Sequence, residues 1–436
     1  MRQVNIIEND KKRSRSITSH RKKQIAKRSV TAFLAIILLM AQSTIGAVST
    51  LRTSSYFVNS EKTDTDIQKP DPNTLYARSA ALIDGNTGRL LYGKEADECL
   101  PMASTTKIMT CILVLETMKL NQTCKVSSYA ASQPQVRLGV QAGWEFHCED
   151  LLYSLMLESH NDSAVILAEA TAGSVENFAL MMNKKAKEIG LSQTHFVTPN
   201  GLDDEAHYTT ARELALLLRY CIRTSPKSKE FLKITQTANY AFTDCTGIRS
   251  FSVYNHNAFL QMMDGALTGK TGFTGKAGYC YVGALEREGR LYIVSLLACG
   301  WPGNKSYKWS DTKKLMKYGL AAFETTKLAT PPIPKMKAKV IEGVYDWSKE
   351  ATAEVELVCK APPKFYQVLA KVGDKIEIRI QARQELAAPV LTTQVCGEVS
   401  YWFGEICLGS YPIYPARPVD RQNFFWYIRR VLSILI

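Results

Sequence analysis

Histidine is scarce in this sequence, and neither its histidines nor its cysteines have the spacing of a metal site. The chain has six histidines and eleven cysteines among 436 residues. No two cysteines form a Cys-x-x-Cys pair, and no histidine stands at zinc-finger spacing. A structural zinc site is therefore not expected, and we predict neither a metal ion nor a cofactor.

The number of cysteines is odd, which limits how they pair in an exported chain. At least one thiol is then free or bonded to a second chain. Cys111 and Cys299 lie in apolar runs, which favours buried and unpaired side chains at these two positions. The sequence does not say which of the other cysteines pair, so the pairing stays open.

The sequence also lacks the stripe of arginines and aromatic residues with which single-strand nucleic-acid binders stack bases. Its formal net charge is +13, but residues 1–28 alone carry ten Lys and Arg against two Asp and Glu. The rest of the chain is only mildly basic. We therefore expect no nucleic acid among its partners.

The basic segment 1–28 leads into an apolar run, "SVTAFLAIILLMAQSTIGAV", at residues 29–48. Its most apolar part has the length of a signal-peptide core, and the whole run approaches the length that spans a bilayer. A cleaved signal, with cleavage after Ala47, and an uncleaved anchor both remain open. In either case the basic flank stays in the cytoplasm and the rest is exported to the outer face of the membrane.

Residues 49–73 are polar and end in "KPDPN", which predicts a linker. Residues 74–325 form the largest folded block. It opens with a predicted β-hairpin around "DGNTG", continues with several helical patterns, and closes with two strand-like runs and a helix. Strands at both ends with helices between them predict one sheet covered by helices, an α/β or α+β arrangement.

A proline-rich boundary at residues 326–336 precedes a change of pattern. Period-two alternation in "KIEIRIQAR" predicts half-buried strands, so residues 337–415 are interpreted as a small all-β domain. Residues 416–436 are predicted to form an amphipathic helix with Arg429 and Arg430 on its polar side. It is too short to span a bilayer and is typical of a helix lying in the membrane surface, although docking on the protein is the alternative.

The spacing Ser-x-x-Lys, which can join a nucleophile to its base, occurs three times, at Ser19, Ser104 and Ser310. The Ser104–Lys107 copy precedes two further motifs inside one predicted domain. These are the Ser-x-Asn at Ser159–Asn161 and the Lys-Thr-Gly at Lys270–Gly272, each the sole copy in the chain. The ordered triple favours Ser104. Ser310 is interpreted as part of an amphipathic helix, and Ser19 as part of the cytoplasmic segment.

A serine hydroxyl is a weak nucleophile until a base takes its proton. At the start of a helix, Ser104 and Lys107 lie one turn apart on one face, so the amine reaches the hydroxyl. Burial beside a second cation, for which Lys270 is the candidate, lowers the pKa of the lysine toward that of a useful base. Ser159 is a candidate proton relay, and Asn161 a candidate for orienting both Lys107 and the substrate amide.

The Lys-Thr-Gly motif stands just before a strand-like segment. On an edge strand it would pair with an extended peptide, while Lys270 and Thr271 hold a terminal carboxylate. The backbone N–H of Ser104, at the positive end of a helix dipole, and that of Phe273 are candidate donors to an oxyanion.

These motifs, with "LIDGNTGRLLYGKEADECLPMASTTKIMT", "LLYSLMLESHNDSAVILAEATAG", "HFVTPNGLDDEAHYTTARELA" and "KTGFTGKAGYCYVGAL", resemble the low-molecular-mass penicillin-binding proteins. These are serine-type D-alanyl-D-alanine carboxypeptidases of the peptidase S11-like family. The resemblance covers roughly residues 74–325, and the β-rich module and C-terminal helix resemble members with a second domain and a membrane anchor.

The resemblance implies a β-lactamase/transpeptidase-like serine hydrolase fold with helices packed on an antiparallel sheet. It implies removal of the terminal D-alanine from peptidoglycan stem peptides ending in D-Ala-D-Ala, and covalent trapping by β-lactams. It further implies a role in acyl transfer or substrate binding for the following residues: Ser104, Lys107, Ser159, Asn161, Lys270, Thr271 and Gly272.

Two positions depart from the family pattern. His160 stands where many members carry glycine, and it either narrows the site or faces away from it. Trp301 and Pro302 follow "LLACG" where some relatives place an arginine that helps to hold the carboxylate, so that second cation is unassigned. A β-lactamase and a non-catalytic cell-wall- or β-lactam-binding protein remain as alternatives, but no Glu-x-x-x-Asn pattern for rapid deacylation follows Asn161.

Overall fold

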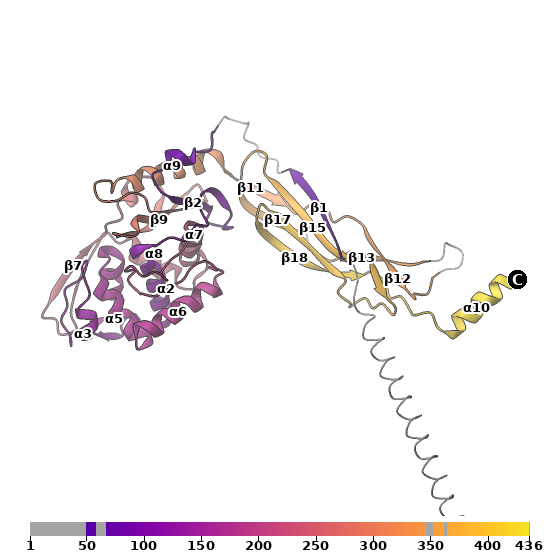
Figure 1. The fold of residues 1–436 in the computed structure, drawn as a ribbon, viewed down its shortest axis with the longest axis horizontal. Coiled ribbons are helices and arrows are strands. Elements are labelled where there is room, and N and C mark those ends of the chain that lie inside the picture. The colour runs from indigo at the N-terminus through magenta and orange to yellow at the C-terminus, as the bar shows by residue number, and fades with distance from the viewer. Residues whose placement is uncertain (1–48, 58–66, 346–351, 362–363, 436) are drawn as a thin grey trace, which may run out of the picture.

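The computed structural model describes residues 49–57, 67–345, 352–361 and 364–435, which form two units, each with its own β-sheet (Figure 1). A helix-rich unit comes first along the chain, and a β-rich unit follows it. Helices packed on an antiparallel sheet, followed by an all-β unit, confirm the predicted fold class. The predicted export segment at residues 29–48 lies outside the described residues.

The helix-rich unit is organised around a five-stranded antiparallel sheet in the order β3-β2-β10-β9-β8. Its strands are β2 (Ser79–Asp84), β3 (Leu90–Lys94), β8 (Ala266–Thr274), β9 (Gly278–Arg287) and β10 (Arg290–Leu297). The sheet thus joins both ends of the block, as predicted. The chain turns between β9 and β10 at Glu288 and Gly289, whose φ angles of 53° and 72° suit a tight hairpin turn.

Helices cover both faces of this sheet (Figure 1). They are α2 (Lys107–Thr117), α3 (Ser128–Ala131), α4 (Cys148–Tyr153), α5 (Asn161–Ala172), α6 (Val175–Glu188), α7 (Ala211–Arg219), α8 (Ser228–Gln236) and α9 (Tyr307–Ala322). Short hairpins are formed by β4 (Thr123–Lys125) with β5 (Glu145–His147), and by β6 (Asn239–Thr243) with β7 (Ser250–Tyr254).

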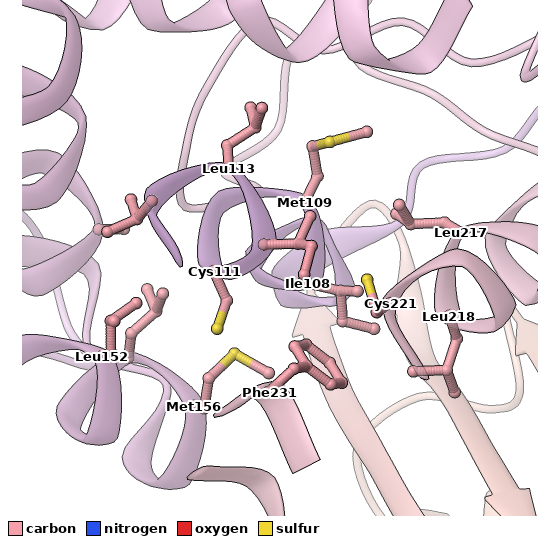
Figure 2. Close-up of a cluster of buried hydrophobic side chains, with 14 of the residues drawn as sticks. Ile108, Met109, Cys111, Leu113, Leu152, Met156, Leu217, Leu218, Cys221 and Phe231 are labelled. Atoms are coloured by element: carbon pink, nitrogen blue, oxygen red, sulfur yellow. The ribbon is translucent and has the colours of Figure 1, made fainter. Parts of the chain in front are cut away.

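Alternation along the strands supplies a core on each face. In β2, Ala81 and Ile83 belong to the cluster that contains α2, whereas Leu82 belongs to the cluster that contains Leu315 and Met316 of α9. Because its sequence is apolar on all sides, α2 lies inside the helical layer. Figure 2 shows its side chains packed against α4, α7 and α8.

The β-rich unit contains a seven-stranded sheet in the order β1-β15-β17-β18-β13-β12-β16 and a two-stranded sheet of β11 and β14. Isoleucines 376, 378 and 380 of β15 are buried on one face, as the period-two pattern predicts. The strands are β1 (Ser49–Phe57), β11 (Glu324–Ala329), β12 (Met336–Ile341), β13 (Ala353–Cys359), β14 (Phe365–Ala370), β15 (Lys375–Arg383), β16 (Glu385–Ala387), β17 (Gly397–Phe403) and β18 (Ile406–Pro415).

Two predicted linkers contain strands of this unit instead. Residues Ser49–Phe57, expected to be a linker, form β1 and pair antiparallel with β15 along its full length. Residues Glu324–Ala329, which overlap the start of the predicted proline-rich boundary, form β11 and pair with β14. Both segments are polar in sequence and take their structure from distant partner strands, so a local pattern did not reveal them.

Arg89 joins the two units. Its guanidinium group donates to Asp374 Oδ2 at 2.9 Å and to the carbonyl of Leu369, and it lies over the ring of Phe403 at 4.2 Å. The Leu369 N–H in turn donates to Asp84 Oδ2 at 3.3 Å. These buried polar contacts tie the β2–β3 hairpin to the start of the β-rich unit.

The last described helix is α10 (Phe424–Leu435), which begins later than the helix predicted over residues 416–436, because Val419 and Arg421 form bridges to Val390 and Gly343. Trp426 is buried and packs edge-on against Tyr345, with ring centroids 5.3 Å apart. Among the side chains of this helix that the structure describes, six large apolar ones are exposed: Phe424, Phe425, Tyr427, Ile428, Val431 and Leu432.

In the described part of the chain, no single helix has the length and apolar composition that crossing a bilayer requires. The bent pair of α5 and α6, whose axes differ by 82°, meets that requirement by length and composition only.

Candidate active site

Ser104 lies in a single 3-10 turn, Ala103–Thr106, directly before α2. Lys107 is the first residue of α2, and its Nζ lies 2.8 Å from Ser104 Oγ. The three-residue spacing therefore places the amine against the hydroxyl, as the sequence predicts.

Lys107 is fully buried and has two further polar contacts. Its Nζ donates to Asn161 Oδ1 at 2.9 Å and to the backbone carbonyl of Asn200 at 2.7 Å. Both of these oxygens are acceptors only. When the lysine is neutral, its two N–H groups satisfy them, and the nitrogen lone pair is left facing Ser104 Oγ. The geometry therefore directs the basic lone pair at the hydroxyl proton.

The surroundings of Lys107 favour this neutral amine. Burial, together with the nearby charge of Lys270, lowers the pKa of Lys107 well below its usual value, against an opposing effect of Asp162. Burial alone lowers the pKa of Lys270 to about 7. Two buried lysines in one site thus have pKa values shifted toward neutrality.

The Ser-x-Asn motif stands at the junction of two helical segments. Ser159 ends the π-helical turn Ser154–Glu158 in a left-handed conformation, with φ of 69°, and Asn161 begins α5. The Oγ of Ser159 accepts a hydrogen bond from Lys270 Nζ at 2.9 Å. The two side chains of this motif therefore contact the two lysines separately, because Asn161 bonds Lys107.

The Lys-Thr-Gly motif lies within β8, which is the edge strand of the five-stranded sheet. The sequence placed it just before a strand, whereas it belongs to one. Gly272 packs directly against the turn that carries Ser104. A Cβ added to Gly272 would come within 2.9 Å of the Ser104 nitrogen and 3.0 Å of the Thr105 nitrogen, so only glycine fits without displacement.

A cleft of about 650 Å³ opens over these motifs. Its lining includes Ser104, Ser159, Asn161, Lys270, Thr271, Gly272 and Phe273, which are all the predicted site residues except Lys107. Lys107 lies beneath the cleft, where Ser104 covers its amine. The structure therefore brings the predicted residues together from three separate segments.

Several residues of the cleft were not predicted. Lys308 of α9 is buried, its Nζ lies 4.6 Å from the ring centroid of Tyr279, and burial lowers its pKa. At another part of the lining, His256 Nε2 contacts Glu158 Oε2 at 2.7 Å. Neither pair belongs to a motif, so no sequence spacing indicated them.

Asn200 was also missed, because it contributes a backbone carbonyl rather than a side chain. The next residue, Gly201, explains the sequence requirement at this point. Its φ is +84°, and a Cβ there would lie 2.0 Å from the carbonyl oxygen of Ala103. The "PNG" segment therefore has to approach the Ser104 turn closely.

His160 lies outside the cleft, which resolves one departure from the family pattern. It is buried, its Nδ1 is hydrogen-bonded to Ser154 Oγ at 2.8 Å, and burial lowers its pKa. The side chain faces away from the site and is structural.

A buried amine lies against a serine hydroxyl, and an edge strand packs closely on the serine through a glycine. This is the arrangement of a serine acyl-transfer enzyme. The family model of the D-alanyl-D-alanine carboxypeptidases, peptidase S11, matches residues 65–298. The chain belongs to this family.

Named relatives of this chain match over most of its length. The D-alanyl-D-alanine carboxypeptidase DacF of Bacillus subtilis (strain 168) is 29% identical over 365 residues, 82% of this chain and 89% of the relative. The D-alanyl-D-alanine carboxypeptidase DacA of Haemophilus influenzae is 30% identical over 341 residues, 76% of this chain and 82% of the relative. The crystal structure of penicillin-binding protein 5 from Haemophilus influenzae aligns with a TM-score of 0.59 at 25% identity, covering 81% of this chain and 99% of that one.

Proposed function

We propose that this chain is a serine D-Ala-D-Ala carboxypeptidase that removes the terminal D-alanine from peptidoglycan stem peptides. The observation that carries the proposal is the set of contacts of Lys107: two carbonyl oxygens accept hydrogen bonds from its amine, and Ser104 Oγ lies 2.8 Å from the same nitrogen. Membership of the family supplies the substrate class.

In the first step Ser104 Oγ attacks the carbonyl carbon between the two D-alanines, and Lys107 accepts the hydroxyl proton. The backbone N–H groups of Ser104 and Phe273 donate to the oxyanion that forms. One such donor contributes about 3–4 kcal/mol in the transition state. The proton that Lys107 took up passes by way of Ser159 to the departing amine of D-alanine as the C–N bond breaks, which leaves a neutral Lys107 and an ester on Ser104.

In the second step a water molecule attacks the ester carbonyl, with Lys107 again accepting a proton. The tetrahedral intermediate collapses, and Ser104 recovers its proton as the shortened peptide leaves. β-Lactams enter by the same attack, but the amine they release stays tethered to the acyl group. We therefore expect them to act as covalent inhibitors.

The terminal carboxylate of the peptide requires a cation and hydroxyl donors. Lys270 and Thr271 of β8 are proposed for this role, with the peptide backbone extended along the free edge of that strand. Lys308 is proposed as the second cation, which the sequence left unassigned. It lines the same cleft and reaches it from α9.

The direct test is release of D-alanine from an acetylated Lys-D-Ala-D-Ala peptide by the purified full chain. Release of many D-alanine molecules per enzyme molecule is the expected result. A folded protein that releases none would reject the carboxypeptidase. Steady turnover of nitrocefin, rather than one burst, would instead favour a β-lactamase.

We further propose that the enzyme works at the outer face of the cytoplasmic membrane and that α10 lies in the membrane surface. Support comes from the basic and apolar segments at residues 1–48 and from the six exposed apolar side chains of α10. A chain beginning at Ser49 is expected to float with vesicles containing anionic lipid. Substituting Ile428 and Leu432 together by glutamate should abolish flotation, and flotation unchanged by this pair would contradict the proposal.

A further inference from the structure

Six of the cysteines are buried in the helix-rich unit: Cys111, Cys124, Cys148, Cys221, Cys280 and Cys299. All eleven cysteines fall within the described residues, and each is a free thiol there. The catalytic chemistry uses none of them. Two of them, however, lie close together at the base of the loop that contacts the second catalytic motif.

Cys124 and Cys148 stand diagonally across the β4–β5 hairpin. Cys124 lies opposite Phe146 in the antiparallel register, and Cys148 follows two residues after Phe146. The backbone N–H of Cys148 donates to the carbonyl of Gln122 at 2.9 Å, which extends the ladder past the end of β5. Cys148 is the first residue of α4, and the same Gln122 carbonyl lies 3.9 Å from Cys124 Sγ, so both cysteines lie beside one carbonyl group.

The two thiols are close enough for each to shift the pKa of the other. This contact lowers the pKa of Cys124 and raises that of Cys148, so Cys124 is the thiol that ionises more readily. A thiolate is the species that attacks a disulfide.

We propose that Cys124 and Cys148 are joined by a disulfide bond in the exported protein. The bond forms during folding, after the hairpin has brought the two thiols together and before the core closes over both sulfurs. The oxidant is the disulfide of an exported thiol–disulfide oxidoreductase. The Cys124 thiolate attacks one sulfur of that disulfide and forms a mixed disulfide, releasing the first thiol of the oxidant. The Cys148 thiolate then displaces the second, so two cysteines are oxidised while one disulfide is reduced to two thiols.

The bond would close the base of the loop that supports the second catalytic motif. Between the two cysteines, the carbonyl of Val136 accepts from the Asn161 N–H at 2.8 Å, and that of Pro134 accepts from Asn161 Nδ2 at 3.1 Å. The loop also donates two backbone N–H groups, from Leu138 and Gly139, to Asp162 at 2.9 Å each. A disulfide at the base limits the conformations open to this loop in the unfolded chain.

Cys111 is the competing partner, because it is buried near Cys148 on α2. Figure 2 shows its sulfur inside the apolar cluster beside Met156 and Phe231. Cys111 lies on α2, whereas Cys124 and Cys148 both lie beside the carbonyl of Gln122. The inference rests on the proposed location, since disulfides persist in oxidising compartments.

The test is a peptide map of the full chain, exported by its host and lysed into an alkylating reagent without reductant. Trypsin separates the three cysteines into peptides 108–119, 120–125 and 138–184. A linked pair of 120–125 with 138–184 is expected. Alkylated thiols at both positions, or a link between 108–119 and 138–184, would overturn the proposal. This map requires no variant.

A second measurement reads the effect of the bond. Reduction of the wild-type chain is expected to lower its Tm by about 6 to 12 °C, the range for a loop of this size in a domain of this size. The Cys124→Ala/Cys148→Ala chain should show no dependence on reductant, while Cys99→Ala, which removes an exposed thiol, should behave as wild type. A wild-type Tm that does not respond to reduction would contradict the proposal.

Acylation by penicillin at a temperature below both transitions should be the same in oxidised and reduced protein, because the folded site is unchanged. Loss of acylation with the linked peptide present would reject the proposed function and leave the disulfide standing. Intact acylation without the linked peptide would reject the disulfide and leave the proposed function standing.

Discussion

Two segments of this molecule carry the same Ser-x-x-Lys spacing in opposite surroundings. Ser104 and Lys107 begin α2, and the lysine is 0% exposed, with Asn161, Asn200 and Lys270 around it. Ser310 and Lys313 lie on α9, where both side chains are exposed. The spacing gives both lysines the reach to contact their serine.

The comparison shows why only one of the two lysines can act as a base toward its serine. At Lys107 two carbonyl oxygens take the N–H groups, and burial removes the water that would stabilise an ammonium ion. At Lys313 solvent remains, and none of the three motif segments surrounds it in the described structure. The reactive copy is therefore selected by residues far away in the sequence.

Removing the serine from each copy should give the largest contrast. Ser104→Ala is expected to lower D-alanine release by at least about 10⁴-fold, because no other nucleophile faces the cleft at that point. Ser310→Ala should leave kcat/KM within about twofold. Steady-state release of D-alanine from the tripeptide measures both. Substantial release by Ser104→Ala would remove the nucleophile from the account.

Removing the amine from each copy should come next in size. Lys107→Met is expected to lower the rate of penicillin acylation by about 10²–10⁴-fold, since the general base is lost while the side-chain volume is retained. Lys313→Met is the matched control and should acylate at the wild-type rate. Stopped-flow acylation at neutral pH separates the two. Equal rates in the two variants would mean that burial of Lys107 has no catalytic consequence.

The close approach of β8 to the Ser104 turn can be tested through its glycines. Gly272→Ala is expected to lower acylation by about 10²-fold, because the added methyl group would lie 2.9 Å from the Ser104 nitrogen and force the turn to shift. Gly275→Ala, on the same segment, meets no atom within 4 Å and should be neutral. The two Tm values show whether either change acts through folding.

The smallest effect concerns pH. Lys270, with a pKa of about 7, loses its charge as pH rises through neutrality and then no longer attracts the substrate carboxylate. Carboxypeptidase kcat/KM should therefore fall above about pH 7, and it should fall again at acid pH as Lys107 takes a proton and loses its lone pair. Lys270→Arg keeps its charge, so its alkaline limb should move upward by more than one pH unit. An unmoved alkaline limb would assign that limb to another group.

Most residues of this site could be predicted from the sequence because they belong to three short motifs. The three motifs indicated Ser104, Ser159 and Lys270, and the fold brings these residues to one cleft. The patterns did not indicate Asn200, which acts through its backbone carbonyl, or Lys308, which reaches the cleft from α9. Such contributions depend on packing between distant segments and leave no spacing to detect.

The fold shows the same division. Hairpins, helices and alternating strands were predicted because each has a local period. The strand Ser49–Phe57 was expected to be a linker because its pairing partner, β15, lies more than three hundred residues away. A polar edge strand is stabilised by the ladder it joins, so its own residues carry little signal.

The central claim is that the surroundings of Lys107, rather than the Ser-x-x-Lys spacing, make one serine of this chain a nucleophile. The most direct measurement is to treat the full chain with fluorescent penicillin, digest it with trypsin and map the label. The account predicts label on peptide 95–107, which contains Ser104, and none on peptide 309–313, which contains Ser310. Label on peptide 309–313, or no label on folded protein, would contradict it.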